Sequence, residues 1–520
     1  MATSEGPDPT WPRTGTQRKI CYSRQPEWQG DSRMAEIQVG DRAFLSSQYA
    51  RISTEQCQKL HWASLEVLER TGVRLFNPAA VEIVRKSGAI VTEQDRVRIP
   101  SGMVEKALAT VPKRAVLCTR NGERRIQIEG HKCYYGPGSD ALHILDHRTG
   151  KRRLPAVRDI EEGVIICDAL PNVDFIMSMF LPADVEQSHY GLYQMEAMLA
   201  NSVKPIVIVT HDLPSLAACV EMAEAVVGGA EELRQNPYVT CYINATTGLL
   251  HNEEALQKLM YLAGKGLPSI YVPVCYGGMT APVTLAGSFA AANAGVLVGL
   301  VISQLVREGV PYIVPGWGAR ALNMRSGAAA YFTPDDKGLM PAMGHYYGLP
   351  MFGYGGFSDS KLVDQQAALE AALSLAFATI EGANLIHDMG YLEAGLSGAH
   401  AQLVLCDEVI GWLSHAVRGV EINDETLALD LIDSKGPNGD YLDSPHTLRH
   451  FRERWTPGIL DQNIHDIWEA AGCRTLGDRL NQRVEKILTT HTPAPLSDDV
   501  RAKIRGIIER ETRGRVTTAR

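Results

Sequence analysis

From about residue 130 onward, short runs of β-branched and aromatic residues alternate with longer stretches whose apolar residues recur at helical spacing. In residues 157–170, for example, Ile160, Val164 and Cys167 fall on one face of a helix. Strands that alternate with helices in this way are typical of parallel sheets covered by helices. The runs that we predict as strands are residues 132–136, 173–179, 204–209, 237–243, 268–274, 311–316, 350–355 and 383–388.

Eight such strands over roughly 260 residues match a TIM (β/α)8 barrel in both count and length. An open, doubly wound α/β sheet remains the alternative, because alternation alone does not show whether the sheet closes. We therefore expect an α/β protein with the (β/α)8 barrel at residues 131–435. The remaining regions are a flexible N-terminal arm at residues 1–40, a small α/β region at 41–130 and a helical C-terminal extension at 436–520.

The small α/β region has one clearly marked helix. Ser53 and Gln56 have the spacing of a capping box, in which each side chain bonds to the backbone of the other residue. Gly72 is suited to end this helix, because glycine readily adopts the left-handed backbone of helix C-termini.

Residues 279–306 contain no charged residue and so imitate a membrane span. The segment nevertheless includes Ser288, Asn293 and Gln304, and it lacks the aromatic belts and flanking basic loops of a true span. We predict a buried helix that packs through its small residues.

The composition favours a soluble protein of the cytoplasm. A formal net charge of -9 argues against non-specific binding to nucleic acid or to an anionic membrane. The 10 cysteines are scattered without a C-x-x-C pair, which is typical of reduced thiols. The first residues show no apolar segment of a secretory signal.

Candidate functional residues stand where the predicted strands end, because the carboxyl ends of the strands carry the site in both architectures. There is no P-loop, and Ser358 occupies the third glycine position of G-x-G-x-x-G in "GYGGFS". There is also no H-E-x-x-H, although a metal held by His211, His387 and a carboxylate stays open as an alternative. The strand-end candidates are Tyr135, Asp140, His211, Asn244, Tyr276, Trp317, Tyr354, Phe357 and His387.

Aromatic residues are prominent among these candidates. A set of aromatic faces binds a quaternary ammonium group, although some of these rings could instead cap the core of the barrel. Glycines adjoin several of the rings, as in "YYGPG", "CYGG", "GWG" and "GYGG", and they allow a ligand or a docking partner to approach the backbone.

Several motifs together make the chain similar to a known family. The segments "YYGPGSDALHILDHRTGKRR", "GGMTAPVTLAGSFAAANAG", "GYGGFSDSKLVDQQAALEAA" and "GPNGDYLDSPHT" resemble the trimethylamine methyltransferase family. The resemblance implies a TIM barrel that transfers a methyl group from a methylated amine to the Co(I) of a separate corrinoid protein. It also implies that the chain itself holds no metal and no tightly bound cofactor.

Archaeal trimethylamine enzymes of this family carry pyrrolysine near the end of a late barrel strand, within or beside the segment that matches "GYGGFSDSK". The present chain has only standard residues there. It therefore resembles the pyrrolysine-free branch, which includes glycine betaine methyltransferase, and the expected substrate is a quaternary amine. Such an amine leaves as a neutral molecule, so desolvation and alignment suffice and no residue is assigned as a general acid or base.

A betaine substrate also needs a partner for its carboxylate, for which His211, His345, Arg320 and Arg325 are the candidates. Asp359 either orients a hydrogen-bond donor or, as we favour, caps the helix that follows it. The glycines expected to face the corrinoid are Gly277, Gly278, Gly355 and Gly356.

Two other functions remain as alternatives to the methyltransferase. One is a metal-dependent barrel hydrolase or lyase, and the other is a betaine-binding protein without catalytic activity. The expected partners are a corrinoid protein and a small quaternary amine, and the apolar content also permits a homo-oligomer.

Overall fold

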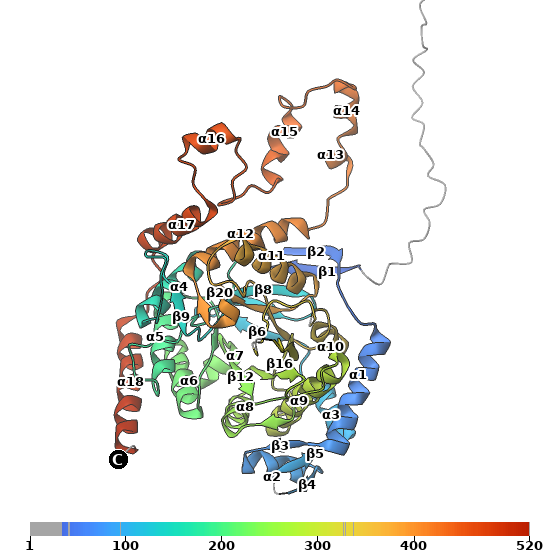
Figure 1. Cartoon of the computed structure of the whole chain (residues 1–520), viewed down its shortest axis with the longest axis vertical. Helices are drawn as coiled ribbons and strands as arrows, with labels where there is room; N and C mark the ends of the chain where they lie inside the picture. Colours follow the sequence, from blue (N-terminus) through green and yellow to red (C-terminus); the bar gives the residue numbers. More distant parts are fainter. Residues whose placement is uncertain are drawn as a thin grey trace, which may run out of the picture.

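The computed structural model describes residues 34–39, 42–93, 95–325, 327, 329–335 and 337–518. Its centre is a set of seven parallel strands that curve as a half-barrel (Figure 1). In spatial order the parallel strands are β11 (Ile206–Ile208), β12 (Val239–Ala245), β14 (Ser269–Pro273), β16 (Tyr312–Pro315), β18 (Met351–Tyr354), β19 (Leu385–Met389) and β8 (Lys132–Pro137). These confirm seven of the eight predicted strands.

The prediction of a strand at residues 173–179 is wrong, since this segment makes only one isolated bridge, between Ile176 and Ile206. Asp174 Oδ2 accepts a hydrogen bond from the backbone nitrogen of Tyr135, where a regular ladder would use a carbonyl oxygen. Met179 has a positive φ of 62°, which breaks the extended backbone. The segment still bonds on both sides, because Asp174 N donates to Tyr135 O and Ile176 N donates to Pro205 O.

Helices cover the outer face of the parallel strands (Figure 1). The predicted helix at 157–170 is α4, and it buries Ile160, Val164 and Cys167 as expected. The helices of this layer are α4 (Val157–Ala169), α5 (Tyr190–Asn201), α6 (Leu213–Val227), α7 (Ala230–Gln235), α8 (Glu253–Lys265), α9 (Leu285–Val306), α10 (Met340–Tyr347), α11 (Gln365–Ile380) and α12 (His400–Ala416).

Helix α9 is the uncharged segment that imitates a membrane span. By length and composition it is the one described helix that could cross a membrane, but 83% of its most apolar window is buried inside the protein. It packs against α1 (Thr54–Glu66), α3 (Ser101–Thr110) and α8. The helix is therefore a core element, as predicted.

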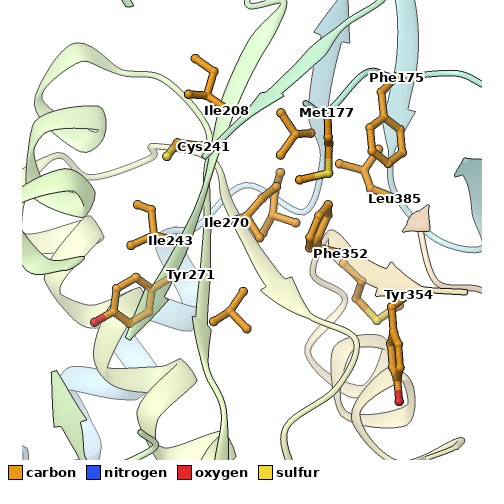
Figure 2. Packing of buried hydrophobic residues seen from close by; sticks show 14 of the residues in the cluster. Phe175, Met177, Ile208, Cys241, Ile243, Ile270, Tyr271, Phe352, Tyr354 and Leu385 are labelled. Carbon is orange, nitrogen blue, oxygen red and sulfur yellow. The ribbon is translucent and has the colours of Figure 1, made fainter. Parts of the chain in front are cut away.

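The inner face of the strands is filled by large apolar side chains. Met177, Ile270, Phe352 and Leu385 converge in the space between the strands (Figure 2). All four are almost completely buried. The strands are thus held by a packed core, and Tyr354 lies at one end of it (Figure 2).

The N-terminal region packs against one side of this core. Ser53 caps α1 in a capping box with Gln56, as predicted. The helix continues as the π-turn η1 (Val67–Thr71) and ends at Gly72, which has a φ of 70°. The other elements of this region are β1 (Met34–Val39), β2 (Arg42–Ser47), β3 (Val73–Leu75), α2 (Pro78–Lys86), β4 (Ile90–Thr92), β5 (Arg96–Arg98), β6 (Ala115–Cys118) and β7 (Arg124–Ile128). The predicted flexible arm lies mostly outside the described residues, and its described end forms β1, which pairs with β8.

Short strands lie at the carboxyl ends of the parallel strands. Strand β15 (Cys275–Gly277) pairs in parallel with β17 (Ala319–Ala321), so that the segments after β14 and β16 lie side by side. The remaining short elements are β9 (His143–Leu145), β10 (Arg152–Arg153), β13 (Leu250–His251), β20 (Tyr391–Leu392), η2 (Glu393–Gly395) and β21 (Ser397–Gly398).

After α12 the chain leaves the body of the protein and later returns to it (Figure 1). We call residues 418–475 the C-terminal excursion. It contains α13 (Asp424–Leu427), α14 (Leu429–Lys435), α15 (Pro445–His450), η3 (Phe451–Glu453) and α16 (His465–Ala470). The chain then packs back, because α17 (Leu476–Thr490) contacts α4 and α12 and α18 (Asp498–Thr518) contacts α6.

Candidate functional site

Aromatic side chains from β12, β18 and β19, and from the segments that follow β16 and β18, gather toward the carboxyl ends of the parallel strands, and we call them the aromatic cluster. Trp317 lies 5.1 Å from Tyr354 and 5.1 Å from His387 between ring centroids. Phe352 stacks on His387 at 4.0 Å. The members of the cluster are Tyr242, Trp317, Tyr331, Phe352, Tyr354, Phe357 and His387.

The geometry of β18 explains how this strand supplies three of these rings. Phe352 and Tyr354 are two residues apart, so both side chains point to the inner face of the sheet. The chain then turns at Gly356, whose φ of 84° suits glycine. This turn brings Phe357 back onto Tyr354, with the two rings 5.1 Å apart and inclined by only 9°.

Two cationic side chains of the protein lie against these rings. The Lys337 ammonium lies 4.0 Å from the centroid of Tyr354 and 5.5 Å from that of Phe357. Lys337 is only 5% exposed. The guanidinium of Arg320 lies 4.0 Å from the centroid of Tyr331. The faces of the cluster therefore already bind positive charge.

Arg320 stays charged in this environment. Burial alone would lower its pKa, but interactions with Tyr331 and Asp388 hold the pKa of Arg320 above its ordinary value. A guanidinium with a nearby carboxylate and ring is well suited to bind a second carboxylate in a bidentate manner.

Asp388 supplies the negative charge beside the cluster. Its Oδ2 accepts a hydrogen bond of 2.5 Å from the Tyr331 hydroxyl, and its Oδ1 lies 3.1 Å from His387 Nε2. Its φ of 81° is left-handed, a conformation that is uncommon for residues other than glycine and that clusters at functional sites. His387 Nδ1 lies 2.6 Å from the carbonyl oxygen of Gly353, and burial lowers the pKa of His387 although Asp388 opposes this effect.

Two more predicted residues lie next to the cluster through Tyr242. The Asn244 side chain bonds to the Tyr242 hydroxyl, and the pKa of Tyr242 is raised first by burial and also by Asp388. Tyr276 belongs to β15 and acts electrostatically on the same hydroxyl. Trp317, Tyr354, Phe357 and His387 are in the cluster itself, so six predicted residues come together.

Tyr135 and His345 are placed elsewhere, which corrects their expected positions. Tyr135 points to the outer face of the sheet, where its hydroxyl lies 2.7 Å from Thr379 of α11. His345 lies on α10, which leads into the amino-terminal end of β18. Its Nε2 lies 2.8 Å from the carbonyl oxygen of Glu381, just before β19 begins. His345 is therefore at the opposite end of the strands from the cluster.

Asp140 and His211 follow other strands and make their own contacts. Asp140 Oδ1 accepts a hydrogen bond of 2.8 Å from Gln194, and burial raises the pKa of Asp140 to about 6. His211 is exposed after β11 and lies 3.2 Å from Asp212. No described ring or hydrogen-bond contact of the aromatic cluster includes either residue.

Asp359 does not cap the next helix, which corrects that prediction. The N-cap of α11 is Asp364, whose side chain accepts from Ala367 N. Asp359 accepts instead from the backbone nitrogens of Tyr331 and Phe332, at 3.3 and 3.1 Å. It thus ties the segment that carries Tyr331 to the end of β18, which is an orienting role.

The four glycines expected to face a corrinoid differ in accessibility. Gly355 and Gly356 are buried, and a Cβ on Gly356 would lie 3.0 Å from Cys406 Sγ. These two glycines therefore allow close packing inside the protein, which corrects the expectation that they face a partner. Gly278 is exposed and Gly277 is partly exposed, beside β15.

Sequence reasoning missed Tyr242, Tyr331, Lys337 and Phe352 as members of this site, and Asp388 entered it only as the last residue of the predicted strand at 383–388. Tyr331 and Lys337 belong to a segment between β17 and α10 that has no regular pattern. Asp388 directly follows His387 at the end of a predicted strand, which was a usable signal.

Among the residues that the structure describes, one group has three metal-binding side chains close together. It consists of Glu425, His446 and His450 in the C-terminal excursion. The group does not include His211 or His387, so the metal site proposed for these two histidines is not assembled in the described structure.

Comparisons with known proteins give a consistent result. The sequence profile described as trimethylamine methyltransferase (MTTB) matches residues 29–515. The chain is 31% identical to trimethylamine methyltransferase MttB of Desulfitobacterium hafniense (strain DSM 10664 / DCB-2) over 91% of the chain and 96% of that protein. It is 29% identical to glycine betaine methyltransferase of D. hafniense (strain Y51), over 89% of the chain and 97% of that protein.

A solved structure is also similar in part. The crystal structure of monomethylamine methyltransferase (MtmB) from Methanosarcina barkeri aligns with a TM-score of 0.45 and 12% identity, and covers 85% of this chain and 89% of that chain.

Proposed function

The chain belongs to the trimethylamine methyltransferase family and is a methyltransferase, and from this premise we propose that its methyl donor is a quaternary amine. The proposed donor is glycine betaine or a related betaine, and the proposed acceptor is the Co(I) of a separate corrinoid protein. One relative acts on trimethylamine and another on glycine betaine, by their names. The choice between them rests on the site.

The observation that carries the proposal is the position of Lys337. Its ammonium lies against Tyr354 and Phe357 in the way that the trimethylammonium group of a betaine would. A quaternary ammonium cannot donate hydrogen bonds, so aromatic faces are its best protein partners. We propose that the substrate ammonium replaces Lys337 at these two rings.

Arg320 supports a betaine rather than a simple amine. A betaine carries a carboxylate close to its ammonium, and Arg320 places a guanidinium beside the same cluster. Of the four candidates for the carboxylate, Arg320 alone contacts the cluster among the described residues, because His345 and His211 lie elsewhere and Arg325 is exposed. A buried Arg–carboxylate pair is strong because both groups are charged and the geometry is bidentate.

The residues of the site have positioning roles in this reaction. Co(I) of the partner would supply the nucleophile. The aromatic cluster desolvates the ammonium, Arg320 fixes the other end of the substrate, and together they hold one methyl group toward the acceptor. No proton is transferred in such a step, so neither His387 nor Asp388 needs to act as an acid or base.

The surface beside the cluster fits a docking partner. Met279, Val283 and Met324 are 62%, 70% and 65% exposed, and they surround Gly278 at the carboxyl ends of the strands. Exposed methionines adapt to a partner surface. We propose that the corrinoid protein docks over these residues and presents its cobalt to the site. The chain itself would hold no cofactor tightly.

We also propose that the seven parallel strands form a closed (β/α)8 barrel through residues 173–180. The backbone of this segment bonds to β8 at Tyr135 and beside β11 at Pro205. These bonds occupy the outer edge of β11 and the part of β8 beyond its pairing with β1, which supports the closure. We place the enzyme in the cytoplasm, without nucleic acid or membrane partners, and its apolar surface is compatible with a homo-oligomer.

A direct assay tests the proposed function. Purified protein would be incubated with Co(I) cobalamin under reducing conditions, with glycine betaine, other betaines or trimethylamine. We expect methyl-Co(III) absorbance with a betaine. Turnover with trimethylamine alone would overturn the substrate class. Tight binding of a betaine without any methyl transfer to cobalt would instead favour a betaine-binding protein.

A further inference from the structure

The C-terminal excursion has almost no core of its own. Within residues 418–475, all of which are described, only Ser444 is buried. Large apolar residues such as Val420, Leu442 and Leu448 are 83%, 83% and 75% exposed. Segments that bury so little apolar surface usually need a further link to hold one arrangement.

The excursion contains a set of side chains that could form such a link. His446 and His450 are four residues apart on α15, so they share one face of the helix. Glu425 belongs to α13 and faces them across the loop. One ligand atom from each of the three residues lies within 4.8 Å of the others.

The hydrogen bonds of the described residues leave Nδ1 of His446 available and direct Nε2 of His450 toward Glu425. His446 Nε2 lies 3.1 Å from the backbone oxygen of Glu425, so this nitrogen donates and Nδ1 keeps its lone pair. His450 Nδ1 lies 2.7 Å from the Glu453 carboxylate, and its Nε2 lies 3.3 Å from Glu425 Oε1, so a cation bound between these two groups would replace this contact. A carboxylate behind a ring nitrogen is the usual support of a metal-binding histidine.

From this arrangement we propose that Glu425, His446 and His450 bind a zinc-type divalent cation that fastens α13 to α15. Two imidazoles and a carboxylate are a ligand set that Zn²⁺ accepts, with water at the fourth position. The ligand atoms of tetrahedral zinc lie about 3.4 Å apart, so the side chains need to move by about an ångström. Such movement is available to these side chains, because Glu425 is exposed and both histidines are partly exposed.

Arg449 competes with the metal in this arrangement. Its Nη2 lies 2.6 Å from Glu425 Oε1, and this ion pair must open before Glu425 can bind a cation. The site lies away from the aromatic cluster, since α13 and α15 extend from the body of the protein (Figure 1). The bound ion would therefore have a structural role and would not take part in methyl transfer.

Zinc binding by the full-length protein tests this proposal. Protein treated with a chelator would be dialysed against Zn²⁺ and analysed for bound metal, and Co²⁺ would report tetrahedral coordination by its visible absorbance. We expect one equivalent in the wild type and in the control His465→Ala, which removes a histidine of α16 outside the group. His446→Ala and His450→Ala should lose the metal, and Glu453→Gln should weaken zinc binding by about 10- to 100-fold.

Two further measurements separate a metal site from a simple ion-pair cluster. Arg449→Ala should bind zinc several-fold more tightly, because its competition for Glu425 is removed. Zinc should also slow proteolysis within residues 418–475 in the wild type and not in His446→Ala. Equal zinc retention by the wild type and the His446→Ala/His450→Ala variant, or none in either, would overturn the proposal.

Discussion

The ammonium group of Lys337 lies 4.0 Å from the centre of the Tyr354 ring, inside the aromatic cluster. A side chain of the protein thus occupies the position that we assign to the substrate cation. Because the two cations need the same aromatic face, binding of the substrate and displacement of Lys337 are coupled.

Replacement of Lys337 should therefore tighten substrate binding. Lys337→Met keeps the apolar stem but removes the charge that competes for Tyr354. We expect the Kd for glycine betaine, measured by calorimetry, to fall by about 2- to 13-fold, because one cation–π contact of about 0.5–1.5 kcal/mol no longer has to be broken. Lys361→Met, on the exposed side of the same region, is the control. A Kd that rises in Lys337→Met would show that Lys337 binds the substrate instead.

Loss of the Tyr354 ring should have the opposite effect. Tyr354→Leu removes an aromatic face, which is worth about 0.5–2 kcal/mol for a desolvated cation, so the KM for a betaine should rise by about 2- to 30-fold. Tyr354→Phe retains the face and should stay close to the wild type in the cobalamin assay. Equal KM values for the Leu and Phe variants would place the ammonium elsewhere.

Arg320 should decide whether a carboxylate is needed. Arg320→Met should weaken the binding of glycine betaine by about 1.5–3 kcal/mol, which is the usual contribution of a hydrogen bond to a charged group. Binding of tetramethylammonium, which has no carboxylate, should not weaken. Calorimetry with both ligands checks this difference. An equal loss of affinity for both ligands would indicate that Arg320 only holds the Tyr331 ring in place and does not bind the carboxylate.

Asp140 should make stability depend on pH. Burial raises its pKa to about 6 in the folded protein, whereas the unfolded value is about 3.9. Between these values the folded state binds more protons than the unfolded state, so stability should fall as the pH rises from about 4 to about 6.

Asp140→Asn should remove this decrease. Asparagine tolerates the left-handed φ of 58° at this position, and its side-chain oxygen can still accept the hydrogen bond from Gln194. Urea unfolding at pH 5 and pH 7.5 should show the variant gaining stability over the wild type at the higher pH. If the unfolding free energy of the variant fell more than that of the wild type between pH 5 and pH 7.5, the Asp140 carboxylate would be stabilised by its neighbours.

The proposed closure of the barrel depends on Asp174. Asp174→Ala leaves Tyr135 N without its acceptor in a buried position, which should cost about 1–3 kcal/mol of unfolding free energy. Asp174→Asn keeps an acceptor oxygen, so its unfolding free energy should fall by less. The backbone amide hydrogen of Tyr135 should exchange with solvent faster in the Ala variant than in the wild type, and the Asn variant should not show this increase.

The sequence predicted the parts of the fold that depend on local pattern. Seven parallel strands and helix α4 could be predicted because their apolar residues recur at fixed spacing. The segment at 173–179 has the composition of a strand, but a side chain takes over one of its backbone bonds. Composition does not reveal such a replacement.

The candidate site was predictable only in part, for the same reason. Tyr354 and Phe357 follow from their place at the end of a strand. The side chain of Tyr135 faces α11 because strand residues alternate between faces, and the sequence does not say which face is inside. Lys337 reaches the cluster through contacts between distant segments, which no local pattern encodes.

The two backbone bonds that Asp359 accepts from Tyr331 and Phe332 have a kinetic consequence. Lys337 follows these residues in the same segment, so its withdrawal from Tyr354 is restrained by the anchor at Asp359. We therefore expect the association rate of the substrate to be set by how often this segment opens rather than by diffusion. We expect the same anchor to hold this segment over the rings during methyl transfer, so that slow access and exclusion of water would have one structural cause.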